Sequence, residues 1–248
     1  MARKGTSKGQ PLPPPLPPAE RTVGQLVAES INFYRHRFWP SLLLGMAPAA
    51  AGVTIAELPN ALKLPVALTF GSGAASSSYA IASAVVAKQR LEVRRLLPAI
   101  AVGIAVLEPA VLLLAFLSIF GLLPAVIWLG LTGFVVPVAV IERRLSWRRA
   151  YELARVDLIH AVGSLATLAI VGLLTGYVIF FTLRSAGTAA LQAAAFLSVL
   201  VIAPLLFLGA ALLYYDQAAR IPTRRSDADL HHAHEPDRPG RADAEGQP

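Results

Sequence analysis

The sequence predicts an all-helical membrane protein, a polytopic bundle of six transmembrane helices with both termini in the cytoplasm and two cytoplasmic amphipathic helices. Three observations predict this fold: few charged residues, a series of long apolar runs, and an uneven placement of Lys and Arg. Of the 248 residues, 55% are hydrophobic and 15% are charged, whereas about 25% is the usual charged share of a soluble domain. With a mean hydropathy of +0.58, this composition argues against a water-soluble enzyme.

The apolar runs have the length of membrane-spanning helices. A helix needs about 20 mostly apolar residues to cross roughly 30 Å of hydrocarbon. The runs lack the alternation of barrel strands, so we expect helices. Glycine and serine interrupt the second run, which is therefore the least apolar. The six predicted spans cover residues 38–57, 64–87, 97–117, 121–141, 159–183 and 188–215.

The placement of positive charge predicts the topology. All but Lys63 and Arg184 of the 22 Lys and Arg residues lie before the first span, in the second and fourth connections, or after the last span. Cationic connections stay in the cytoplasm, so both termini are expected there and the number of spans is expected to be even. The preference for Ala, and for Arg over Lys, further indicates a bacterial cell (inner) membrane.

The net charge of +7 predicts attraction to anionic lipid headgroups on the cytoplasmic side rather than to nucleic acid. The cations concerned lie beside the predicted spans, where their side chains can reach headgroups. The expected lipid contacts are Arg35, Arg37, Arg94, Arg95, Arg148 and Arg149.

Two polar tails flank the membrane domain, which we expect to cover residues 20–216. Residues 1–19 form a Pro-rich cytoplasmic tail, predicted to be disordered, whose prolines at 11–18 favour an extended polyproline path. Residues 217–248 are polar and are also predicted to be disordered in the cytoplasm. This second tail carries a short histidine cluster. We expect no specific metal site there, because a short flexible segment offers no surrounding groups to orient the imidazole rings. The cluster consists of His231, His232 and His234.

Two stretches beside the membrane predict amphipathic helices in the cytoplasmic interface. The first begins at Thr22, which with Gln25 fits a capping box, and apolar residues then recur at helical spacing up to Phe38. The second covers residues 146–157, where Ser146 can cap the helix and aromatic and charged residues occupy different sides. Both helices precede a span that leaves the cytoplasm.

A carboxyl group in the third predicted span is the main candidate for an intramembrane site. Glu108 lies near the middle of that span, where an acidic residue costs about 2.5–3.5 kcal/mol and normally faces the protein interior. It is interpreted either as a proton-coupled or cation-binding group, or as a structural hydrogen-bonding group. The expected partners are Ser76, Ser77, Ser78, Tyr79 and Gln192. Charged residues near the span ends, namely Glu57, Asp157, His160 and Asp216, are assigned no special role.

The sequence shows no constellation typical of an enzyme. Cysteine is absent, which excludes disulfides and thiolate metal sites. No phosphate-binding Gly-rich loop, zinc-type His motif or serine nucleophile elbow is present. We therefore expect no catalysis, no cofactor and no bound metal.

Several short motifs resemble the glycerophosphoryl diester phosphodiesterase membrane-domain family. The first is Glu29 followed by Arg35, Phe38 and Trp39, ahead of the first span. The others are Glu142 with Trp147 and the run 150–153, and the run 213–216 that closes the sixth span. The resemblance covers residues 21–220 and implies a six-helix membrane domain. Stand-alone members of that family mostly have no assigned function, and this chain carries no phosphodiesterase domain.

Two functional hypotheses remain open. The first is a non-enzymatic membrane module that scaffolds protein partners, forms a homo-oligomer or engages anionic lipid through its basic inner face. The second is a small transporter or permease with a polar cavity around the second span and Glu108. A membrane-embedded lipid enzyme is a weaker third hypothesis.

Overall fold

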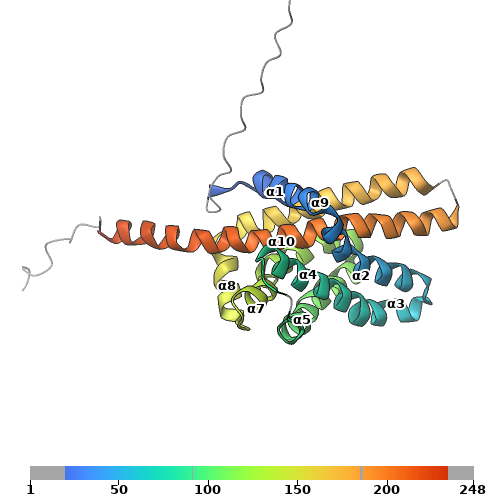
Figure 1. The fold of residues 1–248 in the computed structure, drawn as a ribbon, viewed down its shortest axis with the longest axis horizontal. Coiled ribbons are helices and arrows are strands. Elements are labelled where there is room, and N and C mark those ends of the chain that lie inside the picture. Colours follow the sequence, from blue (N-terminus) through green and yellow to red (C-terminus); the bar gives the residue numbers. More distant parts are fainter. Residues whose placement is uncertain (1–19, 91, 185–186, 234–248) are drawn as a thin grey trace, which may run out of the picture.

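A computed structural model describes residues 20–90, 92–184 and 187–233 of the chain, and every regular element in these ranges is helical. Figure 1 shows the helices packed around one very long helix, α10. In chain order the α-helices are α1 (Val23–His36), α2 (Phe38–Glu57), α3 (Asn60–Val66), α4 (Ser72–Val86), α5 (Val93–Leu117), α6 (Leu122–Thr132), α7 (Val135–Ile141), α8 (Trp147–Val156), α9 (Leu158–Leu183) and α10 (Thr188–Ala233).

Four helical stretches in the described part of the chain are long and apolar enough to cross a membrane: Phe38–Glu57, Leu96–Ile141, Leu158–Leu183 and Ala189–Ile221. The coarse prediction of an all-helical membrane fold is therefore confirmed. The predicted number of six spans stays a prediction. The second predicted span, 64–87, is helical but is not among these four stretches.

The stretch Leu96–Ile141 folds back on itself rather than continuing straight. A short 3₁₀ turn, η3 (Ser118–Gly121), separates α5 from α6, and Ser118 adopts a left-handed φ of 52°. Helices α5 and α6 then pack against each other, and the Trp128 indole donates a hydrogen bond of 2.8 Å to the Val106 carbonyl. Gly121 is required at this turn, because a Cβ there would collide with the Leu113 carbonyl.

The second predicted span is built from three consecutive helical segments. α3 leads into a widened π-type turn, η2 (Ala67–Gly71), which leads directly into α4. Such π-type turns are rare insertions in helices. Here the turn coincides with the Gly- and Ser-rich start of α4, where Ser72 bonds to the Leu68 carbonyl.

Both predicted amphipathic helices are present with the expected caps. Thr22 and Gln25 form the reciprocal capping box of α1, and the Ser146 hydroxyl accepts from the Arg149 backbone N–H at the start of α8. Only part of the apolar side of each helix is buried against protein, since Ile31 of α1 and Trp147 and Tyr151 of α8 are exposed. Leu26 of α1 and Leu153 of α8 belong to the same core cluster and are both fully buried.

α10 is the central helix of the bundle and extends well beyond it (Figure 1). It packs against α1, α2, α4, α8 and α9. The helix continues through Gln217, which is fully buried, to Ala233. The predicted start of a disordered tail at Gln217 is therefore wrong, because Gln217 contacts the bundle and the helix does not end there. The first tail, 1–19, and residues 234–248 lie outside the described residues.

Candidate functional site

Four serines of α4, namely Ser72, Ser76, Ser77 and Ser83, donate hydrogen bonds to backbone carbonyls. Ser76 is fully buried and donates a hydrogen bond of 2.7 Å to the Ile100 carbonyl of α5, while Ser77 donates to the Gly73 carbonyl of its own helix. Ser78 is 3% exposed. The Ser76 and Ser77 hydroxyls therefore stabilise helix packing and helix α4 itself, which is the usual role of serine in membrane helices.

The predicted partners of Glu108 bond elsewhere. Gln192 is exposed and donates a hydrogen bond of 2.6 Å to the Glu57 carboxylate at the far end of α2. Glu108 is half-buried on α5, and in the described residues no hydrogen bond or ion pair joins it to Ser76, Ser77, Ser78 or Gln192. The structure therefore does not bring the predicted polar site together as a bonded cluster.

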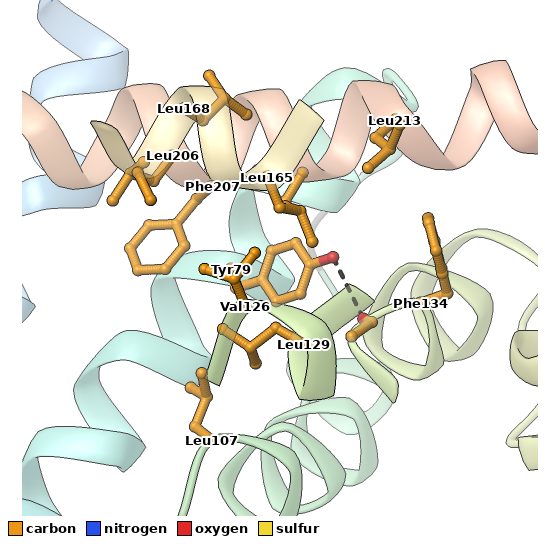
Figure 2. A pocket seen from close by; sticks show the side chains of 13 residues that line it. Tyr79, Leu107, Val126, Leu129, Phe134, Leu165, Leu168, Leu206, Phe207 and Leu213 are labelled. Carbon is orange, nitrogen blue, oxygen red and sulfur yellow. Dashed lines mark hydrogen bonds between the residues drawn. The ribbon is translucent and has the colours of Figure 1, made fainter. Parts of the chain in front are cut away.

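The space beside the second predicted span is an apolar cavity of about 180 Å³. Figure 2 shows side chains from α4, α5, α6, α9 and α10 converging on it. The hydroxyl of Tyr79 is the one side-chain polar group in its wall, and it donates a hydrogen bond of 3.2 Å to the Gly133 carbonyl. The Tyr79 ring stacks on Phe207 of α10 with centroids 6.1 Å apart. This cavity suits hydrocarbon rather than a polar solute.

A second space opens between α9 and α10 as a groove of about 670 Å³. Ala169 and Leu206 line both the groove and the cavity, so the two spaces adjoin. Tyr177 and Phe180, at the far end of α9, are 65% and 45% exposed along the groove. The groove therefore connects the cavity region with the flank of the bundle.

A buried charged cluster joins the segment before α1 to the start of α9 and to α10. Asp216 is fully buried, and its carboxylate pairs with the Arg21 guanidinium at 3.2 Å and lies 3.8 Å from His160 Nε2. Arg220 pairs with Asp157 at 2.7 Å and donates to the Arg21 carbonyl at 2.7 Å. These contacts fasten the beginning of the membrane domain to its last helix.

A second charged cluster centres on Glu142, directly after α7. Its carboxylate accepts from Arg149 at 3.0 Å, from the Tyr214 hydroxyl at 2.9 Å and from Arg144 at 2.9 Å. Burial acts to raise the pKa of Glu142, but these three hydrogen bonds and the Arg149 charge outweigh burial, so the net pKa lies below its ordinary value. Glu142 thus connects α7, α8 and α10 as an ionised carboxylate.

Sequence reasoning missed both clusters. Asp157, His160 and Asp216 were assigned no special role, but the structure joins them in a charged cluster because α10 is still packed against the bundle at Asp216 and Gln217. The sequence did offer one sign of these clusters: a charged residue, Asp216, lies two positions after an aromatic one, Tyr214, at the end of the last predicted span. Which distant groups meet them depends on tertiary packing.

The predicted lipid contacts fall into three groups. Arg35, Arg37 and Arg94 are exposed, and the Arg37 guanidinium lies 5.7 Å from the centre of the Phe33 ring. Arg148 is 91% exposed and pairs with Glu152, whereas Arg149 is 25% exposed and pairs with Glu142. The Arg149 charge is therefore directed into the protein. The Arg95 side chain lies outside the described residues.

An arginine pocket of about 370 Å³ lies where α5 begins and α7 ends. We define it by Arg94, Arg143 and Arg144, with the less polar wall formed by Pro98, Ala139 and Leu145. Arg143 adopts a left-handed φ of 58°, a conformation that few non-glycine residues take. Within the described ranges, Arg94 and Arg143 make no hydrogen bond or ion pair. The sequence did not single out Arg143.

No group of three or more His, Asp or Glu residues that could hold a metal ion occurs in the part of the chain that the structure describes. The His234 side chain and those of His231 and His232 lie outside that part.

The fold thus places this chain among all-helical proteins with several helices apolar enough to span a membrane. Comparisons of the chain with protein-family models, curated proteins and solved structures found no match. Membership of the glycerophosphoryl diester phosphodiesterase membrane-domain family therefore stays a prediction.

Proposed function

We propose that this chain is a non-enzymatic, six-span module of the bacterial inner membrane that engages anionic lipid headgroups at its cytoplasmic face. The count of six follows if the folded-back stretch Leu96–Ile141 crosses twice and if residues 60–86 cross once. At 1.5 Å per residue, that last helical run is about 40 Å long, which exceeds the roughly 30 Å of hydrocarbon. The first and last elements then both lie on the cytoplasmic side.

The arginine pocket is the observation that carries the lipid proposal. Guanidinium groups recognise phosphate through paired, charge-assisted hydrogen bonds. In the described residues, Arg94 and Arg143 have no such bond to protein, and Arg144 shares its charge with Glu142. Pro98 and Ala139 of the neighbouring helices border the pocket, so a bound phosphate would lie where hydrocarbon begins. This combination fits a phospholipid headgroup.

Lipid retention measured by native mass spectrometry tests this proposal. The double variant R94Q/R143Q should lose phosphatidylglycerol relative to phosphatidylcholine by about thirtyfold, since a cation near the membrane surface contributes about 1 kcal/mol. The matched control K88Q/R90Q removes the same charge from two exposed cations of the second connection that do not line the arginine pocket. Equal retention in the two double variants would overturn the proposal.

The topology is tested separately. A tag inserted between Leu58 and Asn60 should be accessible only from outside the cytoplasmic membrane. Cytoplasmic accessibility of that tag would overturn the six-span arrangement with cytoplasmic termini. A scaffolding role with a protein partner or a second copy would be indicated by co-purification of one defined partner.

The alternative of a small transporter receives less support. The serine hydroxyls that were expected to line a polar cavity bond to carbonyls of Ile100 and Gly73, and the adjacent cavity is apolar. Proton- or solute-dependent flux in liposomes that is lost in E108Q would favour the transporter over the lipid module.

A further inference from the structure

The cavity next to Tyr79 is poorly suited to water. A buried water usually makes about three hydrogen bonds to polar groups. The wall offers one polar side chain, the Tyr79 hydroxyl, whose proton is already donated to the Gly133 carbonyl. A space of this size lined by aliphatic and aromatic groups therefore favours an apolar occupant.

The groove gives that occupant a route from the bilayer. It shares Ala169 and Leu206 with the cavity, and it runs between α9 and α10 toward Tyr177 and Phe180. Among the described residues that line it, only Tyr177 and Ser198 carry polar side-chain groups, and the Ser198 hydroxyl is bonded to the Ala194 carbonyl at 2.7 Å. Both helices belong to stretches apolar enough to cross a membrane, so the surroundings of the groove supply hydrocarbon chains.

The dimensions and the charge at the end of α9 fit a lipid. From Leu165 in the cavity to Phe180 in the groove, α9 rises about 22 Å at 1.5 Å per residue, which exceeds the roughly 15 Å of one leaflet. Arg184 follows at the end of α9, with its guanidinium 3.8 Å from the centre of the Phe181 ring. This cation lies where the phosphate of a lipid entering from that end would be.

We propose that the groove and the cavity together bind one acyl chain of a membrane phospholipid. The chain enters beside Tyr177 and Phe180, passes between Ala169 and Leu206, and ends beside Tyr79 and Phe207. The headgroup stays near Arg184, at the opposite end of the bundle from the arginine pocket. This site is therefore independent of the headgroup site proposed above.

Photo-crosslinking with a positional probe tests the path of the chain. The full chain is reconstituted in phosphatidylcholine vesicles that contain phosphatidylglycerol with a diazirine either at the acyl terminus or near the headgroup, and labelled residues are mapped by mass spectrometry. The terminal diazirine should label cavity residues such as Leu165 and Phe207. The diazirine near the headgroup should label Tyr177 or Phe180.

A blocking variant supplies the second test. A169F places a phenyl ring at the junction of groove and cavity, so terminal labelling of Leu165 should fall at least about fivefold, because a packed wall accommodates extra volume poorly. A195F makes the same substitution at an exposed position of α10 that lines neither space, and it should label like the wild type. L206W blocks the junction from the other wall if A169F does not fold.

Three results would overturn the proposal. One is terminal labelling confined to outward-facing residues of α9 such as Ile170 and Val178, which are 52% and 63% exposed. Another is unchanged cavity labelling in both folded blocking variants. The third is crosslinking of groove residues to a second copy of the chain, which would mean that protein rather than lipid covers the groove.

Discussion

The end of the bundle that carries Asp216 and Glu142 and the middle of the bundle hold their polar groups in opposite ways. At the end, Asp216 contacts Arg21 and His160 from distant parts of the chain. Glu142 contacts Arg149 of α8 and Tyr214 of α10. In the middle, Tyr79 makes one hydrogen bond to the backbone, and Glu108 makes no hydrogen bond or ion pair with the described residues. The contrast shows that charge stabilises the junctions between helices at the end, while apolar packing dominates deeper in the bundle.

Removing the most buried carboxylate should produce the largest effect. D216A removes the buried carboxylate that pairs with Arg21 and lies close to His160, and breaking a buried pair costs about 3–5 kcal/mol. The free energy of unfolding in detergent, measured by circular dichroism during denaturant titration, should fall by that amount. D216N, which keeps the volume, should lose less. A loss below about 0.5 kcal/mol in D216A would remove the argument that this cluster fastens the first segment to α10.

Glu142 should contribute a smaller, pH-dependent stability. E142Q removes the charge that accepts from Arg144, Arg149 and Tyr214, and hydrogen bonds to charged groups contribute about 1.5–3 kcal/mol. Because the pKa of Glu142 is lowered in the folded state, its contribution is fully present above the ordinary value of 4.5 and is lost as the pH falls through the folded pKa.

The difference in unfolding free energy between wild type and E142Q should therefore shrink as the pH is lowered below 4.5. R148Q is the control, because Arg148 pairs with Glu152 while 91% exposed, and such surface pairs contribute about 0–1 kcal/mol. A constant difference between wild type and E142Q across this pH range would contradict the assigned cluster.

The single hydrogen bond of the cavity should matter less than either charged cluster. Y79F leaves the Gly133 carbonyl without its donor, and hydrogen bonds between membrane helices average about 0.6 kcal/mol. Thermal unfolding should show a correspondingly small decrease in stability. A loss as large as that of D216A would mean that the middle of the bundle depends on polar contacts as strongly as its end does.

The smallest effect is expected at Glu108. E108Q replaces the carboxyl group by an amide of similar size without breaking any described hydrogen bond, so insertion should be intact and the unfolding free energy should change by less than about 0.5 kcal/mol. A loss of several kcal/mol would show that this carboxyl has a structural partner, and the contrast between the two regions would then fail.

The sequence alone determined the helical membrane class and much of the local structure. Apolar runs longer than a bilayer requires leave the backbone no alternative to helices, and the caps at Thr22 and Ser146 depend on residues within one turn. Both features depend on neighbours along the chain, so they can be inferred from spacing. The order of apolar and cationic segments likewise supports a topology.

Tertiary structure alone decided which polar groups meet. Gln192 bonds to Glu57 rather than to Glu108, and Asp216 pairs with Arg21 from the start of the chain. Whether the side chains around Tyr79 fill the space between five helices or leave a cavity depends on how those helices are rotated and displaced. A sequence specifies the apolar face of each helix, but the partner of each side chain is fixed only when the helices pack, since many pairings satisfy the same pattern of hydrophobicity.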